Sequence, residues 1–321
     1  MVAAAAGTTM LLYKASSGGI QSDAQNTSKR PTRLLYEASP LEDLWMSKSG
    51  DKEWIDHPCD HLQDEARKWM DVLGSSNRLD AEHADWTSIF SVFKNDALDG
   101  SGPVISQPIE PLAYNLRAPT FQCSSDMMDF KGLYNVDWLV LATAEMYPNR
   151  DKSYFFDVGC TLYGNVPGTK FFVDAYNQNG IEFDHIYGRE ARTIEPKKYW
   201  DHVPDEMVHK MTFYNVPASK EVDEPLNPIT LLKITCKMED FCVLKIDVDT
   251  PVVEEAWIQQ ILDDPIAQSL IDELFFEHHV HGIIQGDKGQ WWGTNVKGTF
   301  EDSYKLFTAL RKVGIRAHSW V

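Results

Sequence analysis

The spacing of apolar residues changes character about a third of the way along the chain. Over residues 60–74 they recur on one helical face, and Gly74 marks the predicted end of that helix. The same spacing predicts a second helix over residues 85–94. Gly and Pro then interrupt residues 100–120, which is typical of an irregular connection, so we place a domain boundary there.

Beyond Asp129, short apolar runs alternate with helical segments, which is the pattern of a parallel sheet with crossover helices. Strands are predicted over residues 153–159, 184–190, 210–219, 241–251, 273–280 and 315–321. Helices are predicted over residues 136–147, 169–180, 227–235, 252–262 and 301–314, with a short one from Pro196. We therefore predict an α/β fold with a doubly wound, mostly parallel sheet.

Composition divides the chain into three parts. Residues 1–30 lack periodicity and are rich in Ala, Ser and Gly, so we expect a disordered arm. A mainly helical N-terminal extension over residues 31–120 and the α/β domain over residues 121–321 follow. No window approaches the roughly 18 apolar residues of a membrane-spanning helix, and the start lacks the pattern of a secretory signal.

Charge and cysteine content narrow the classes of partner and compartment. The 321 residues carry a formal net charge of -18 at pH 7, which repels phosphate backbones, so we expect no nucleic-acid partner. The five cysteines are odd in number and show no CxxC spacing. Reduced thiols and a cytoplasmic location are the simplest prediction, with the secretory pathway or an organelle as alternatives.

Polar residues at the carboxyl ends of strands are candidate site residues, because ligands of open α/β sheets bind beyond those ends. The first such end carries Asp157, Gly159 and Gly164. Glycine lets a ligand approach the backbone closely, and the carboxylate can accept hydrogen bonds from an amine or a hydroxyl. An ordinary strand followed by a glycine turn is the alternative.

The next two strand ends carry Glu190 and Asn215. Nucleotide-binding folds place a carboxylate like that of Glu190 where it accepts hydrogen bonds from ribose hydroxyls. Arg189 or Arg192 would instead make it part of a structural ion pair. The Asn215 amide both donates and accepts, as recognition of an adenine edge requires, but Asn-Val-Pro is also common turn chemistry.

The fourth strand end carries Lys245, Asp247 and Asp249 at alternate positions, so the three side chains share one side of the strand. Ionisable groups in such a place are costly as mere packing, because buried charge needs a partner. The alternative for Asp249 is to cap the following helix, in whose first turn Pro251 fits well.

These strand ends together carry a family resemblance. The succession FFDVG, YGRE, FYNVP and VLKIDVDTPVVEE, within residues 150–265, resembles the core of the FkbM-type methyltransferases of the class I S-adenosylmethionine-dependent fold. The sequence departs from the family after Gly159, where Thr161 replaces an Asn and the next glycine, Gly164, comes later. The resemblance implies a sheet of the class I methyltransferase type with S-adenosylmethionine as the cofactor.

The resemblance also implies individual roles. The glycine loop with Asp157, Gly159 and Gly164 would approach the methionine part of the cofactor, Glu190 its ribose, and Asn215 its adenine. Asp247 would face the donor or the acceptor.

The run Glu277-His278-His279 ends the strand that lies next to the fourth one in this fold. One interpretation is an oxygen-rich site for Mg²⁺ or Mn²⁺, formed by Asp247, Asp249 and Glu277. Another is that His278 or His279 removes a proton from a hydroxyl as a general base. A third is structural, with histidines that bridge acidic side chains. Alternation along a strand puts Glu277 and His279 on one side and His278 on the other.

We therefore predict an S-adenosylmethionine-dependent O-methyltransferase that acts on a small-molecule or carbohydrate hydroxyl, with Asp247, His278 and His279 as catalytic residues and a divalent ion as an open question. A non-catalytic scaffold subunit with a protein partner is one alternative. A metal-dependent glycan-transfer enzyme that uses Asp247 and Asp249 is another. The glycine-rich residues 282–298 are predicted to form a lid or to pack beneath the N-terminal helices.

Overall fold

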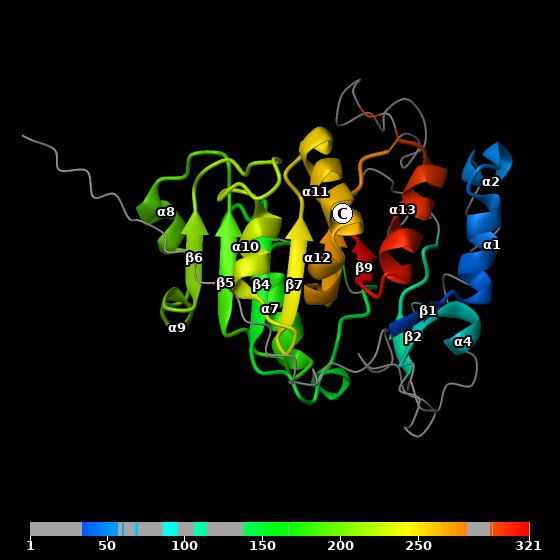
Figure 1. Cartoon of the computed structure of the whole chain (residues 1–321), viewed down its shortest axis with the longest axis horizontal. Helices are drawn as coiled ribbons and strands as arrows, with labels where there is room; N and C mark the ends of the chain where they lie inside the picture. Colours follow the sequence, from blue (N-terminus) through cyan, green and yellow to red (C-terminus); the bar gives the residue numbers. More distant parts are fainter. Residues whose placement is uncertain are drawn as a thin grey trace, which may run out of the picture.

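The molecule contains a large parallel sheet and a small antiparallel one (Figure 1). The computed structural model describes residues 34–56, 60, 68–69, 86–95, 106–113, 136, 138–165, 167–280, 296 and 298–320. The large sheet comprises β4 (Ser153–Val158), β5 (His185–Arg189), β6 (Met211–Tyr214), β7 (Phe241–Ile246), β8 (Glu273–Phe276) and β9 (Arg316–Ser319). The predicted α/β fold with a parallel sheet is confirmed.

The order of the six strands is β6-β5-β4-β7-β8-β9, and every neighbouring pair is parallel. The chain thus builds the sheet outward from β4 in one direction and then from β7 in the other, as in doubly wound Rossmann folds. β9 pairs directly with β8. Among the described residues no antiparallel strand joins this sheet, so the final antiparallel hairpin that is usual in the resembled family is not seen.

Seven helices flank the large sheet in the described part of the chain (Figure 1). They are α7 (Thr169–Gln178), α8 (Pro196–Trp200), α9 (Asp205–Val208), α10 (Pro228–Thr235), α11 (Pro251–Asp263), α12 (Pro265–Leu270) and α13 (Phe300–Lys312). Phe172 of α7 packs on Phe155 and Phe275, whereas Phe307 of α13 packs on Phe276. Because successive strand residues face opposite sides, these two helices cover opposite faces of the sheet.

Local sequence explains where several of these helices begin. Asn227 caps α10 with its side-chain oxygen, and Pro228 occupies the first turn. Thr299 and Asp302 form a capping box at the start of α13. Between the helices, β7 is buried over its whole length, as expected for a central strand that is covered on both faces.

The N-terminal part lies beyond β9 and α13 at one end of the molecule (Figure 1). Its elements are β1 (Leu34–Glu37), α1 (Pro40–Lys48), α2 (Lys52–Asp56), α4 (Trp86–Ile89), β2 (Ser91–Asn95) and β3 (Ser106–Ile109), and the three strands form an antiparallel sheet. The mainly helical pattern did not predict this sheet. Most of the helix predicted over residues 60–74 lies outside the described residues.

The helix predicted over residues 136–147 is wrong. Only a short 3₁₀ turn, η2 (Ala144–Met146), forms in this segment. The amide nitrogen of Val140 donates to Glu110 and that of Ala142 donates to Glu273, at 3.0 and 3.1 Å. Carboxylates that are distant in sequence therefore take the hydrogen bonds that a helix would have formed within itself.

A disulfide joins Cys236, at the end of α10, to Cys242 in β7. The prediction of reduced thiols is therefore wrong for these two residues, whereas Cys160 is a buried free thiol. Disulfides persist in oxidising compartments, so cysteine usage no longer supports the predicted cytoplasmic location. None of the helices in the described residues has the length and apolar character needed to cross a membrane.

A buried ionic network attaches the N-terminal part to the sheet. It contains three acidic and three basic side chains, each at most 2% exposed: Glu42, Glu110, Glu273, Arg311, Arg316 and His318. Arg316 donates to Glu273 at 2.8 Å, and His318 lies between Glu110 and Glu273 at 2.7 and 3.2 Å. Each negative charge in this network therefore has a positive partner.

Charge pairing in the network shifts the pKa of its members strongly. Burial alone would raise the pKa of Glu273, but Arg316 and His318 lower it to about 2. Burial likewise opposes the charged form of His318, yet Glu110 and Glu273 raise its pKa above the ordinary value. His318 is therefore protonated, and the charges of the three acids and three bases of the network cancel.

Candidate functional site

Five parallel strands deliver polar residues to one edge of the large sheet. Because β4 to β8 run in the same direction, the residues that follow them meet at the carboxyl edge. The candidates that directly follow a strand there are Gly159, Glu190, Asn215, Asp247 and Glu277. Asp157, in contrast, lies inside β4.

Gly159 joins the exits of β4 and β7, the strands between which the order of the sheet reverses. Its φ is +98°, and a Cβ added to it would lie 1.5 Å from the carbonyl oxygen of Asp247. Only glycine fits this contact. Gly164 lies farther along the loop in open space, with nothing within 4 Å of an added Cβ.

Asp157 is fully buried and bound within the protein. It accepts a hydrogen bond from the Thr169 hydroxyl at 2.6 Å, at the start of α7, and one from Lys245 Nζ at 3.2 Å. Lys245 also contacts the carbonyl oxygen of Gly159 at 3.3 Å and Asp247 at 3.0 Å. These partners bind both carboxylate oxygens of Asp157 within the protein and support the β4 exit, and its contact with a cofactor stays a prediction.

Asp247 is held by the same lysine and by the C-terminal strand. Its Oδ2 accepts a hydrogen bond from Trp320 Nε1 at 3.1 Å. Burial raises its pKa, but Lys245 and hydrogen bonds from Lys245, Glu277 and Trp320 hold the pKa below the ordinary value. Burial would also lower the pKa of Lys245, yet Asp157 and Asp247 raise it above the ordinary value. Asp247 is therefore an ionised partner of Lys245.

Glu190 follows β5 as a mostly buried carboxylate. Its Oε1 accepts a hydrogen bond from the backbone nitrogen of Arg192 at 2.7 Å, and the exposed Arg192 side chain lies 3.4 Å away. Arg189 does not pair with it but stacks over the ring of Tyr214. Glu190 Oε2 accepts no hydrogen bond from the described residues and so remains for a ligand.

Asn215 uses its amide within the protein. Oδ1 accepts a hydrogen bond from the Ile194 nitrogen at 2.8 Å, and Nδ2 donates to the carbonyl oxygens of Glu190 and Arg192 at 2.9 and 2.7 Å. The side chain therefore shapes the loop after β5. In this arrangement it does not present the donor and acceptor pair that adenine recognition was predicted to use.

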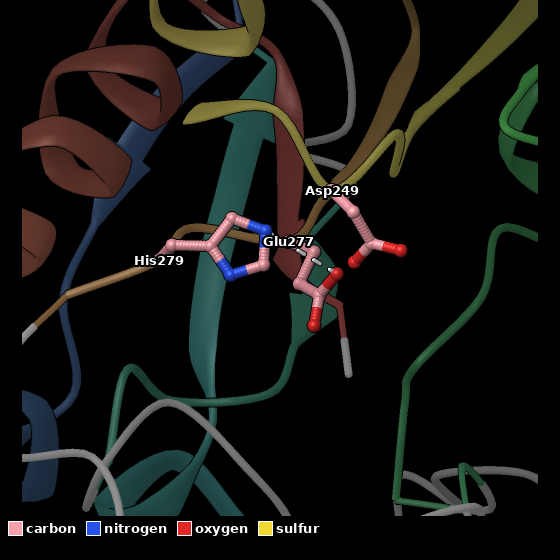
Figure 2. A group of neighbouring side chains, drawn as sticks. All are labelled: Asp249, Glu277 and His279. Atoms are coloured by element: carbon pink, nitrogen blue, oxygen red, sulfur yellow. Dashed lines mark ion pairs between the residues drawn. The ribbon is translucent and has the colours of Figure 1, made fainter. Parts of the chain in front are cut away.

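Asp249, Glu277 and His279 form a compact group at the exits of β7 and β8 (Figure 2). One ligand atom of each lies within 4.8 Å of the others. Glu277 and His279 are buried, whereas Asp249 is exposed in a turn with φ +55°. The predicted metal set of Asp247, Asp249 and Glu277 therefore differs in one member, because Asp247 is bound to Lys245 and His279 takes its place.

His278 faces away from this group. Its Nδ1 lies 2.9 Å from the Ser303 hydroxyl of α13, and its ring stacks on Phe276. Burial and the neighbouring His279 lower its pKa to about 4, so the ring is neutral near pH 7. The predicted catalytic role does not suit His278, which packs between the sheet and α13.

Glu254 is a site residue that the sequence pattern missed. It lies in the first turn of α11, where Oε1 accepts a hydrogen bond from the Val248 nitrogen at 2.7 Å and Oε2 lies 3.6 Å from His279 Nε2. Burial, together with Asp247 and Asp249, raises its pKa to about 7. Its helical spacing to the buried Trp257, three positions on, was the available signal that it faces inward.

Three comparisons bear on the identity of the chain. None of the family models, curated proteins or solved structures compared with it matches. The site must therefore be interpreted from its own chemistry.

The segment predicted as a lid, residues 282–298, lies almost entirely outside the described residues. His281 lies outside them as well.

The carboxyl edge combines two kinds of chemistry. Near Glu190, beside the switch point of the sheet, a carboxylate oxygen is available, as suits a nucleoside. Around His279 three carboxylates converge on one imidazole. A ligand that spans both regions would meet a hydrogen-bond acceptor at one end and proton-accepting groups at the other.

Proposed function

We propose that this chain is an S-adenosylmethionine-dependent O-methyltransferase for a small-molecule or carbohydrate hydroxyl. The observation that carries the proposal is the carboxylate of Glu190, which directly follows the second strand of a doubly wound sheet and keeps Oε2 free of described partners. In nucleotide-binding folds this position accepts hydrogen bonds from ribose hydroxyls. The Gly159 turn at the neighbouring strand exit lies at the switch point of the sheet, where ligands of such folds bind.

The proposed chemistry asks little of the protein beyond position and proton removal. The bound cofactor would supply an electrophilic methyl group. The protein then needs to align an acceptor oxygen and take its proton. We assign proton removal to the group formed by Asp249, Glu254, Glu277 and His279, which lies at the exits of β7 and β8, next to the switch point. In that reaction the C–S bond of the cofactor would break towards sulfur as the O–C bond forms.

A non-catalytic scaffold is the second candidate. The observation in its favour is that the polar side-chain atoms of Asp157 and Asn215 form hydrogen bonds within the protein. A scaffold needs the architecture but no nucleoside site. A glycan-transfer enzyme would instead need Asp247 and Asp249 on one cation, whereas Asp247 is committed to Lys245 and Trp320.

Isothermal titration with S-adenosylmethionine tests the proposal. We expect saturable binding at one site per chain, and Glu190→Gln should weaken it roughly tenfold or more, because a hydrogen bond to a charged acceptor is lost. Glu206→Gln, which neutralises an exposed carboxylate on α9, is the matched control and should bind as the wild type does. Absence of binding at millimolar cofactor would refute the methyltransferase and favour the scaffold.

A further inference from the structure

We propose that Asp249, Glu277 and His279, with Glu254 as a fourth donor, bind one divalent transition-metal ion, and that Mn²⁺ fits the site best. The proposal concerns the same group to which the proposed function assigns proton removal. The ion would bind without the cofactor, so metal binding and cofactor binding can be tested and rejected separately.

Donor spacing is the first argument. The three ligand atoms lie within 4.8 Å of one another, and His279 Nε2 lies 3.6 Å from the nearest oxygen of Glu277 (Figure 2). Two donors that are each roughly 2.1 Å from a common ion lie roughly 3 to 4.2 Å apart. The group therefore closes around an ion with side-chain shifts of well under 1 Å at its widest point.

The buried oxygen of Glu254 is a second, independent observation. Glu254 is fully buried, and its Oε2 accepts no hydrogen bond from the described residues, although its Oε1 is held by the Val248 nitrogen. A buried polar oxygen without a donor is costly. Oε2 lies 3.6 Å from His279 Nε2, at the same distance as the Glu277 oxygen. An ion beside Nε2 would satisfy both carboxylates.

The charges around the group also favour a bound cation. Four carboxylates gather at the exits of β7 and β8 and in the first turn of α11: Asp247, Asp249, Glu254 and Glu277. The one lysine among them, Lys245, is shared between Asp157 and Asp247. Like charges in such proximity need a compensating cation or protons. A divalent ion would supply two positive charges beside these carboxylates.

The donor types select the kind of ion. Mg²⁺ prefers oxygen ligands alone, whereas an imidazole nitrogen favours transition metals. Carboxylates suit Mn²⁺ as well as Mg²⁺, so a site of one imidazole and three carboxylates favours Mn²⁺ over Mg²⁺. Asp249 is the solvent-exposed member of the group.

Titration of the EDTA-dialysed full chain with MnCl₂, without cofactor, tests the site. We expect one Mn²⁺ per chain by calorimetry and by loss of the free-ion electron paramagnetic resonance signal, with Mg²⁺ roughly tenfold or more weaker. Pulsed resonance should detect a ¹⁴N coupling from the His279 imidazole, which a purely acidic surface site would lack.

Three variants localise the bound ion. Asp249→Asn changes an exposed side chain and leaves the core intact, and both it and His279→Ala should weaken Mn²⁺ roughly tenfold or more. Glu255→Gln, on the exposed side of α11 next to Glu254, is the matched control and should bind like the wild type. Absence of saturable Mn²⁺ binding would overturn the proposal, as would binding that Asp249→Asn leaves unchanged or that shows no ¹⁴N coupling.

Discussion

Two clusters of buried charge lie at the two ends of one strand and differ in their balance. Glu273 begins β8 and Glu277 directly follows it, and both are buried. Glu273 belongs to the ionic network, where Arg316 and His318 contact it and Tyr176 donates a hydrogen bond to it. Glu277 belongs to the acidic group at the carboxyl edge, where its described neighbours are mostly other carboxylates.

The two clusters differ in how far their acids are paired with bases. In the network, three acids meet three bases, and the pairing holds the pKa of Glu273 at about 2. At the carboxyl edge the acids outnumber the bases, and the pKa of Glu254 rises to about 7. Perturbed carboxylates without matching cations are typical of sites that bind a ligand or move protons. The end of β8 therefore has the charge pattern of such a site, and its start does not.

Removing a base from the network should have the largest effect. Arg316→Met leaves the Glu273 charge buried and takes a donor from the carbonyl oxygens of Pro108 and Val140. We expect the free energy of unfolding to fall by about 3 to 5 kcal/mol in urea denaturation followed by tryptophan fluorescence. Lys197→Met, which breaks an exposed pair with Asp201, should change it by less than about 1 kcal/mol.

A double variant sharpens this prediction. Arg316→Met combined with Glu273→Gln removes both charges, so it should be more stable than Arg316→Met alone. Equal stability of the single and double variants would show that the unpaired Glu273 charge is not the source of the loss.

The next effect is a pH dependence that belongs to the network. The pKa of Glu273 is lowered from its ordinary 4.5 to about 2 in the folded protein, so its contribution is present above pH 4.5 and is lost as the pH falls towards 2. For this fully buried group the shift corresponds to about 3 kcal/mol. Urea denaturation at a series of pH values measures it. Glu273→Gln should lack this part of the acid loss, and an identical pH profile in the variant would contradict the assignment.

The smallest change in the free energy of unfolding, a gain rather than a loss, is expected at the other end of β8. Glu277→Gln keeps a hydrogen-bond donor for Asp247 and removes one of several buried acids, so the free energy of unfolding of the metal-free protein should rise by about 1 kcal/mol at pH 7. The same denaturation assay checks it, with Glu255→Gln as the exposed control. A loss as large as that expected for Arg316→Met would remove the contrast between the two clusters.

Much of the parallel sheet followed from local pattern. The apolar runs at residues 153–159, 184–190 and 241–251 contain β4, β5 and β7, and helical spacing located α7, α10, α11 and α13. The residues directly after these strands could then be assigned to one edge, because parallel strands end together. Glu277, His278 and His279 also separated onto two sides, as strand alternation predicts.

Non-local partners account for most of the errors. Residues 91–94 were predicted to be helical but form part of β2, because they pair with β1 and β3. Val140 and Ala142 give their amide nitrogens to distant carboxylates instead of to a helix. Cys236 and Cys242 showed no recognisable spacing, and the turn between α10 and β7 brings their sulfur atoms together.

The order of residues along the chain determined which polar groups reach the carboxyl edge, since strand direction and side-chain alternation are local properties. Tertiary structure alone decided which of them stay available there. Lys245 pairs with Asp157, 88 positions away, and with Asp247, whereas Asp249, Glu277 and His279 lie together. Which acids pair with Lys245 depends on distances between segments that can be remote in sequence, because charges interact through space rather than along the chain.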